Sequence, residues 1–297
     1  MRDQLALNRR ELEAALEAAR ETEERYRIIA ETVSDAIITI DEHSRILFIN
    51  LAAEKIFGYT LAEMMGQPLV MLMPEYLRHL HQAGLKSYIE TGHKHISWKA
   101  VELPGLHKSG REIPLELSFG EFTKDGKRFF TGIVRDINER KRGERRLIAQ
   151  YAVTRELSES ATLAEAAPKI LQAISENLDY QVAALWHVER ELDALRCVET
   201  WHVPSMPETQ FEAYSKRRTF ARGVGIPGQV WASGAPLLVH DIATDSQYPR
   251  SSLAEKENLH GAVAFPLLLG SEILGVIEFF THETREPDED LVKMMSA

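Results

Sequence analysis

Residues 35–58, "DAIITIDEHSRILFINLAAEKIFG", decide the fold of the first half of the chain. Residues 35–41 and 45–50 follow an apolar period of two, and the polar "EHS" between them is a turn signal. These two runs, which are rich in Ile and Phe, therefore predict a β-hairpin. The apolar spacing then becomes helical and the run ends at Gly58, a residue type that favours helix C-caps. A helix directly after a hairpin predicts a mixed fold.

Downstream of this hairpin, helix and strand signals continue in the same mixed order. Thr60 and Glu63 have the spacing of a capping box for a short helical turn, and a longer helix is predicted over residues 75–90. Three strands are then predicted over residues 95–103, 113–122 and 128–136. Two strands, several helices and three more strands predict an α+β domain with an antiparallel sheet.

The first 25 residues are predicted to form one helix. Its apolar positions alternate between spacings of three and four, which is typical of a coiled coil. The seam consists of Leu5, Asn8, Leu12, Ala15, Ala19, Thr22, Tyr26 and Ile29. Because Ala, Asn and Thr fill half of these places, the seam would hold a homodimer only with help from the attached domains. A solvated lead-in helix is the alternative.

Residues 139–158 are predicted to form a charged linker helix, and residues 159–297 a second domain. The linker run "ERKRGERR" is interpreted as the solvated face of a helix, since the chain is acidic. The strand-like runs "QVAALWHV" and "LRCVETWHV", with an apolar hairpin around Gly270 and Ser271, predict a second sheet covered by helices. A helix that starts near Pro287 stops with the chain, so we expect it to be truncated and followed by an output domain.

The composition is that of a globular protein, with 44% hydrophobic residues, 27% charged residues and a net charge of −10. This charge argues against nucleic-acid binding, because phosphate contacts need a basic face. No apolar run approaches the roughly 20 residues of a membrane helix. The polar N-terminus is unlike a secretory signal, so we expect a cytoplasmic chain without membrane insertion. The one cysteine, Cys197, permits no internal disulfide and is expected to be a buried thiol.

The sequence contains no catalytic motif. "GVGIPG", residues 223–228, has the glycine spacing of a dinucleotide loop, but a polar and basic run precedes it where a buried strand is required. The glycines are therefore interpreted as turn residues. The motifs of serine hydrolases, zinc proteases and phosphate-binding loops are absent, as are those of a histidine kinase core and a diguanylate cyclase. Whether the whole protein is an enzyme stays undecided.

One set of motifs keeps a fixed order along the first domain: Asn50, Glu54, Phe57, Gly58, the turn "KSGREIP" and the terminal "RDI". In this order and spacing the domain resembles a PAS domain, with expected bounds of 26–138. The resemblance implies a five-stranded antiparallel sheet with helices over one face and a small pocket. The later run "GIPGQVWASGAPLLVHDI" and the hairpin after it resemble a GAF domain, which implies an antiparallel sheet sandwiched by helices.

The segment "MPEYLRHLHQAGLKSYIETGHKHI", residues 73–96, contains four of the 11 histidines. On the predicted helix, His81 falls at the centre of the apolar stripe, whereas His79 faces water. The stripe also contains Gly84, Leu85 and Tyr88. Because the side chains of His79 and His81 point to opposite sides, they cannot chelate one metal. A histidine on an apolar face is usually a core residue whose ring nitrogens are hydrogen-bonded.

The same segment resembles the haem-bearing PAS domains of FixL-type oxygen-sensor kinases. The resemblance implies that His81 is the proximal iron ligand of a haem b and that His95 lies near the haem edge. It also implies that Leu117 and Phe119 lie on the gas-binding side. Val101 stands where such sensors place an arginine that binds oxygen, so this donor would be missing. Two alternatives stay open: another small ligand, or a purely structural pocket.

Together these features predict a homodimeric PAS–GAF sensory module of a bacterial signalling protein, most similar to a two-component sensor histidine kinase. A small-molecule ligand would bind two conformations unequally and shift the coiled helices. The PAS resemblance implies that Asp136 couples the sheet to the linker through a basic neighbour, Arg140 or Lys141. A diguanylate cyclase is the alternative parent, and a ligand-free dimerisation and relay module is the alternative function.

Overall fold

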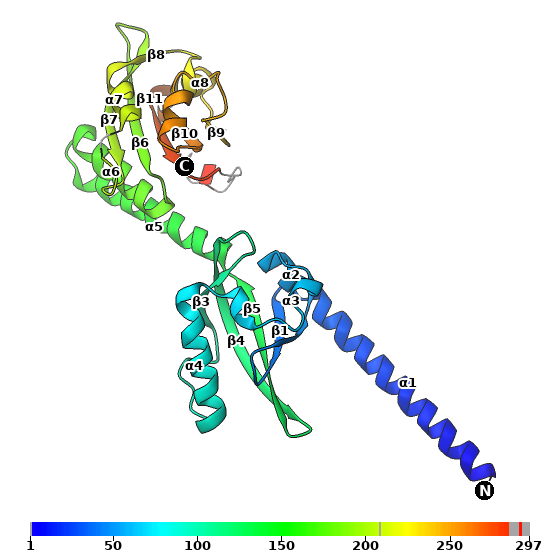
Figure 1. Cartoon of the computed structure of the whole chain (residues 1–297). Helices are drawn as coiled ribbons and strands as arrows, with labels where there is room; N and C mark the ends of the chain where they lie inside the picture. Colours follow the sequence, from blue (N-terminus) through cyan, green and yellow to red (C-terminus); the bar gives the residue numbers. More distant parts are fainter. Residues whose placement is uncertain (1, 208, 285–290, 293–297) are drawn as a thin grey trace. The chain divides into compact units, whose positions relative to one another are not determined.

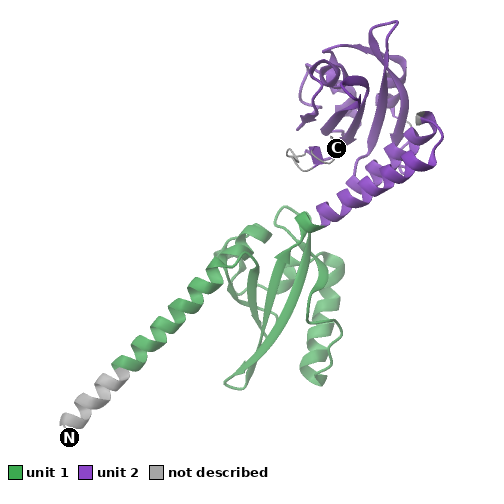
Figure 2. Ribbon diagram, turned by 180° about the vertical axis from the view of Figure 1, so that it is seen from behind, with its two compact units in different colours: residues 1–140 green, residues 141–297 purple. Residues whose placement is uncertain are grey.

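The computed structural model describes residues 2–207, 209–284 and 291–292. The chain forms two compact units, Met1–Arg140 and Lys141–Ala297 (Figure 2). Among the helices of the described residues, none is both long enough and apolar enough to cross a bilayer. The helix expected from Pro287 onward lies outside the described residues, apart from two of its positions.

Unit 1 contains a five-stranded antiparallel sheet in the order β2-β1-β5-β4-β3 (Figure 1). The strands are β1 Ala36–Asp41, β2 Ile46–Ile49, β3 Val101–Leu106, β4 Glu112–Lys124 and β5 Lys127–Asp136. The predicted hairpin is confirmed, because β1 pairs with β2 and places Ile38 opposite Ile49. The long strand β5 lies at the centre and pairs with β1 and β4. The predicted α+β fold with a five-stranded sheet is therefore confirmed.

Short helices and one longer helix pack against one face of this sheet. They are α2 Leu51–Phe57, α3 Leu61–Met64, the 3₁₀ helix Leu69–Leu72 and α4 Glu75–Thr91. Phe57, Met64 and Tyr88 from these helices share one core with Ile38 and Leu115 from the strands. The opposite, outer face of the sheet carries the alternate residues of each strand.

Local hydrogen bonds determine where the short helices begin and end. The side chain of Asn50 accepts a hydrogen bond from the backbone N–H of Ala53 at 3.2 Å, so it caps the start of α2. Gly58 ends this helix in the left-handed conformation, with a φ of 74°, as the sequence predicts. The carboxylate of Glu63 accepts from the backbone N–H of Thr60 at 2.9 Å, which confirms the capping box of α3.

The N-terminal helix α1, Arg2–Thr32, continues past residue 25, where the sequence predicts its end. Side chains of the proposed seam are described only from residue 13 onward, so Leu5, Asn8 and Leu12 lie outside that part. Tyr26 and Ile29 of the seam are exposed in the single chain. The coiled coil itself stays a prediction.

The strand predicted over residues 95–103 is wrong in its first half, because β3 begins only at Val101. The hydroxyl of Ser97 donates to the carbonyl of Lys99 at 2.9 Å and closes a tight turn. Ala100 has a positive φ of 50°, which interrupts an extended backbone. Local turn chemistry therefore overrides the apolar spacing of this segment.

Unit 2 contains a six-stranded antiparallel sheet in the order β8-β7-β6-β11-β10-β9. The strands are β6 Val182–Glu189, β7 Ala194–His202, β8 Thr219–Ala221, β9 Leu237–Val239, β10 Gly261–Leu269 and β11 Glu272–Thr281. The predicted hairpin around Gly270 is confirmed as β10 and β11. Strand β6 pairs with β7 on one side and with β11 on the other.

Helices lie on both faces of the second sheet. They are α5 Asn138–Glu159, α6 Leu163–Leu178, α7 Gln210–Arg217, α8 Gly225–Ser233 and α9 Ser251–Lys256. Alternate residues of β6 separate two cores: Leu185 packs with Leu171 of α6, whereas Trp186 packs with Phe211 of α7 and Val230 of α8. This arrangement confirms the predicted sheet sandwiched by helices.

In the segment "GVGIPG" only Gly223 and Val224 lie in the turn before α8, because the helix already begins at Gly225. The interpretation of the glycines as turn residues is therefore wrong for residues 225–228. Gly223 and Gly225 have positive φ values of 82° and 67°, which suit glycine. A Cβ atom on Gly228 would lie 2.3 Å from the carbonyl oxygen of Ala221. Backbone conformation therefore accounts for Gly223 and Gly225, and close packing accounts for Gly228 inside α8.

Candidate functional site

The side chain of His81 connects α4 to the turn between β1 and β2. Its Nε2 atom lies 2.8 Å from the Oγ atom of Ser44. Ser44 is buried and has a positive φ of 62°, and its carbonyl accepts a hydrogen bond from Leu69 at 2.8 Å. A hydroxyl can donate or accept, so it suits either tautomer of the imidazole. Sequence reasoning missed Ser44; its place in the "EHS" turn is the signal that could have indicated it.

Burial lowers the pKa of His81 below its ordinary value. The imidazole is therefore neutral at neutral pH. A neutral ring can hydrogen-bond to Ser44 and can equally bind a metal ion, so the charge state alone does not assign its role.

Four aromatic side chains, which we call the aromatic cluster, pack against one another where α4 meets the sheet: Tyr88, Trp98, Phe119 and Phe130. The ring of Trp98 lies 4.8 Å from that of Tyr88, 6.3 Å from Phe119 and 6.5 Å from Phe130. The hydroxyl of Tyr88 donates to Glu121 at 2.9 Å. Burial and the neighbouring carboxylate both raise the pKa of Tyr88. These contacts join α4, the loop after it and strands β4 and β5.

The remaining predicted pocket residues have different surroundings. Leu85 of α4 and Leu117 of β4 are half-buried and pack against the core of unit 1. Gly84 lies on α4 with open space where a Cβ would stand. His95 is exposed, and its Nε2 atom lies 2.8 Å from the hydroxyl of Ser87. The structure therefore places Leu85 and Leu117 against the core and His95 at the surface.

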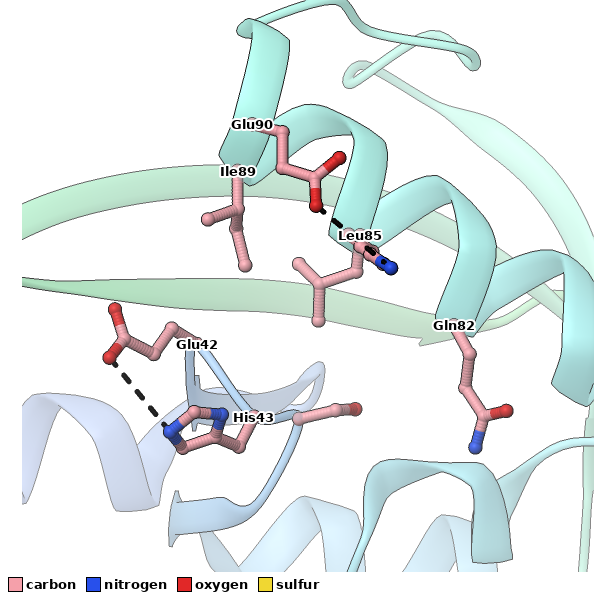
Figure 3. Close-up of a pocket in the computed structure, with 8 residues that line it drawn as sticks. Glu42, His43, Gln82, Leu85, Ile89 and Glu90 are labelled. Carbon is pink, nitrogen blue, oxygen red and sulfur yellow. Dashed lines mark ion pairs between the residues drawn. The ribbon is translucent and has the colours of Figure 1, made fainter.

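A groove of about 490 Å³ lies between the β1–β2 turn and α4 (Figure 3). It is lined by Glu42, His43, Ser44, Gln82, Leu85, Lys86, Ile89 and Glu90. Figure 3 shows Leu85 and Ile89 pointing from the helix toward the turn. Glu42 comes from the turn and Glu90 from the helix, so carboxylates stand on both sides of an apolar floor. This volume falls within the range of small-molecule sites.

Of the groove residues, only Leu85 was predicted from the sequence. Each of the others on α4 lies three or four positions from another lining residue of this helix, which places them on one helix face. Two weak ion pairs lie at the rim: Lys86 with Glu90 at 4.0 Å and His43 with Glu42 at 3.9 Å. The groove residues of the β1–β2 turn were not predicted, because no local sequence pattern shows that this turn lies next to α4 in the fold.

At the end of β5, the two predicted coupling residues have separate partners. The carboxylate of Asp136 accepts a hydrogen bond from the backbone N–H of Asn138 at 2.8 Å, at the first residue of α5. Arg140 donates to Glu102 at 2.8 Å and lies 3.6 Å from Glu116. Thus Asp136 caps the helix, whereas Arg140 attaches its first turn to strands β3 and β4.

A buried ion pair lies in the core of unit 2. Arg250 and Glu278 are 2% and 0% exposed and meet through two hydrogen bonds of 2.6 and 2.7 Å. The indole N–H of Trp186 donates to the same carboxylate at 2.8 Å. Burial raises the pKa of nearby Cys197 to about 12, so its thiol is unreactive. Within the described residues, no three His, Cys, Asp or Glu side chains form a metal site.

Comparison with known families assigns both units. A family model described as the PAS fold matches residues 24–137, and one described as a GAF domain matches residues 160–297. The chain is a PAS domain followed by a GAF domain. The PAS match contains the five-stranded sheet with α2 to α4, and the GAF match contains the six-stranded sheet with α6 to α9.

Three curated relatives show which proteins carry similar domains. Sensor protein FixL of Bradyrhizobium diazoefficiens is 33% identical over 57% of this chain and 32% of its own length. Oxygen sensor protein DosP of Escherichia coli is 30% identical over 33% of this chain and 12% of its own. Cell-division control histidine kinase PdhS of Brucella ovis is 30% identical over 42% of this chain and 12% of its own length. This chain therefore spans a third or less of each relative.

The residues of this PAS domain do not fit a haem bound through His81. A macrocycle between α4 and the sheet would displace Trp98 and Tyr88 from the aromatic cluster. Nε2 of His81 is already engaged by Ser44, and His95 is exposed. The space that is open beside α4 is the groove, whose rim carries charged side chains.

Proposed function

We propose that this chain is the sensory part of a bacterial sensor histidine kinase that acts as a cytoplasmic homodimer. The order of PAS and GAF domains and the printed names of FixL and PdhS support this proposal. The sequence itself contains no catalytic motif, so phosphotransfer would belong to another part of the protein. The chain then contributes ligand recognition and transmission of the resulting change.

In this proposal the PAS domain binds a small amphipathic molecule in the groove beside α4. Leu85 and Ile89 supply an apolar floor, while Glu42 and Lys86 supply opposite charges at the rim. The observation that carries the proposal is the hydrogen bond between His81 and Ser44, which joins α4 to the β1–β2 turn, the two elements that line the groove. A ligand that separates or closes these walls would break or strengthen this bond, and so favour one of two conformations.

A screen of small fragments by ligand-observed NMR tests this site directly. Fragments with an apolar ring and one charged group are expected to bind the wild-type chain. The Gln82→Trp variant, which fills the groove from α4, is expected to lose that binding. His79→Trp is the matched control, because it adds the same side chain to an exposed position of the same helix. Equal binding by the wild type and Gln82→Trp, or binding by neither, would contradict the proposed ligand site.

A further inference from the structure

A row of alternating charges crosses the outer face of the PAS sheet. Its members, in spatial order, are Asp35, Arg135, Glu116, Arg140 and Glu102. On β4 the neighbours of Glu116, Leu115 and Leu117, face the core, so Glu116 faces outward. The row begins at Asp35, three residues after α1, and ends at Glu102 of β3. Its fourth member, Arg140, comes from the first turn of α5. The row lies on the face of the sheet opposite the helices that border the groove.

The strand register explains why Arg140 occupies its place. Glu102 of β3 lies directly opposite Glu116 of β4, and Glu116 lies directly opposite Arg135 of β5. Two like charges facing each other across neighbouring strands destabilise a sheet. The guanidinium of Arg140 neutralises this repulsion, since it lies 2.8 Å from Glu102 and 3.6 Å from Glu116. The sheet therefore presents a paired negative site to the start of α5.

The opposite end of the row is attached to α1. Arg135 donates to both carboxylate oxygens of Asp35, at 3.0 and 2.8 Å. The side-chain amide of Asn50 donates to the carbonyl of Asp35 at 3.0 Å and to that of Ala30, in the last turns of α1, at 2.8 Å. Asp35 is only 19% exposed, which limits the freedom of its side chain. A displacement of the end of α1 would therefore move Asn50 and Asp35, and through Asp35 it would move Arg135.

We propose that this row of charges couples the end of α1 to the start of α5 across the outer face of the PAS sheet. Asp35 is its positioning residue next to α1 and Arg140 its positioning residue on α5, and Arg135 and Glu116 connect them. The PAS domain would thus transmit a change in α1 to α5 without any ligand in its groove. This inference rests on the proposed role in signal transmission, but it uses a different face of the domain from the proposed ligand site.

Hydrogen exchange of the full chain, without added ligand, tests the coupling. The readout is the set of amides at residues 142–144, whose helical hydrogen bonds end on the carbonyls of residues 138–140. Asp35→Asn, which removes a charge that does not touch α5, is expected to raise their exchange rates about two- to fivefold. Arg140→Gln is expected to raise them at least as much. The increase should shrink at about 1 M salt, where surface charges are screened.

Two variants separate coupling from general destabilisation. Asp35→Glu keeps the charge and is expected to retain the wild-type rates. Asp41→Asn removes a carboxylate at the other end of β1, where it accepts from His43 and Arg45, and is expected to leave residues 142–144 unchanged. Faster exchange in Arg140→Gln with no change in Asp35→Asn would overturn the proposal. An equal increase in Asp41→Asn would do the same. Because no ligand is present, failure of the fragment screen does not alter this readout.

Discussion

At the scale of single residues, His81 provides a titratable contact between α4 and the β1–β2 turn. Burial lowers its pKa in the folded chain, whereas an unfolded chain has a histidine pKa of about 6.5. Protonation therefore favours the unfolded state. The stabilisation contributed by neutral His81 is complete above about pH 6.5 and is lost progressively as the pH falls below that value.

The first prediction concerns the variant His81→Gln. The difference in unfolding free energy between the wild type and this variant should fall below about pH 6.5, by at most about 1.4 kcal/mol per pH unit. Urea unfolding followed by circular dichroism from about pH 5.5 to 7.5 measures it. His79→Gln, on the exposed side of α4, is the matched control for the loss of an imidazole from the same helix. A constant difference for His81→Gln over this range would contradict the account.

The buried pair Arg250–Glu278 leads to a second prediction at this scale. Arg250→Met leaves a buried carboxylate without its counter-charge and should destabilise the GAF domain by about 3–5 kcal/mol. Adding Glu278→Gln should recover part of that loss, because the amide oxygen can still accept from Trp186. Arg190→Met, at the exposed pair with Glu272, should cost less than about 1 kcal/mol. Thermal unfolding monitored by tryptophan fluorescence would compare them, and equal losses at both sites would refute the prediction.

At the scale of secondary-structure elements, patterns within one segment were predictable from the sequence. The β1–β2 hairpin and the end of α2 at Gly58 are coded by alternating residues, turn residues and a helix cap. The start of β3 was not predicted, because the turn closed by Ser97 and the positive φ of Ala100 interrupt a segment with strand-like apolar spacing. The partners of Arg140 were missed for a related reason: they depend on the register of β3 against β4. Contacts between segments therefore cannot be predicted from the spacing of residues within one segment.

The helix α5 leads to a third prediction. Leu147, Ile148 and Tyr151 lie on one side of it and are 67%, 55% and 72% exposed in the single chain. Apolar side chains at these spacings favour pairing with a second helix. We expect the wild type to sediment as a dimer, and Leu147→Glu with Tyr151→Glu to shift it toward monomer. Arg145→Glu, about 120° around the helix from Tyr151, should stay dimeric. A monomeric wild type would contradict this expectation.

At the scale of the whole molecule, two sensory domains follow one another, and each has its own sheet and core. Their fold class and order were predictable because their motifs extend over many residues. The candidate ligand could not be predicted from the sequence, since the same helix position can hold an iron ligand or a hydrogen-bonded core histidine. The ring of Trp98 packs within the aromatic cluster, which favours the hydrogen-bonded histidine. A single aromatic residue outside the quoted histidine segment thus changes the interpretation.

The absorption spectrum of the chain, purified from cells supplied with haem precursor, tests the central claim most directly. That claim is that the aromatic cluster occupies the place beside α4 that a haem on His81 would need, so that a ligand binds in the groove instead. The account predicts no Soret band in the wild type, even after haem is added to the purified protein. A stoichiometric Soret band that disappears in His81→Ala would contradict it.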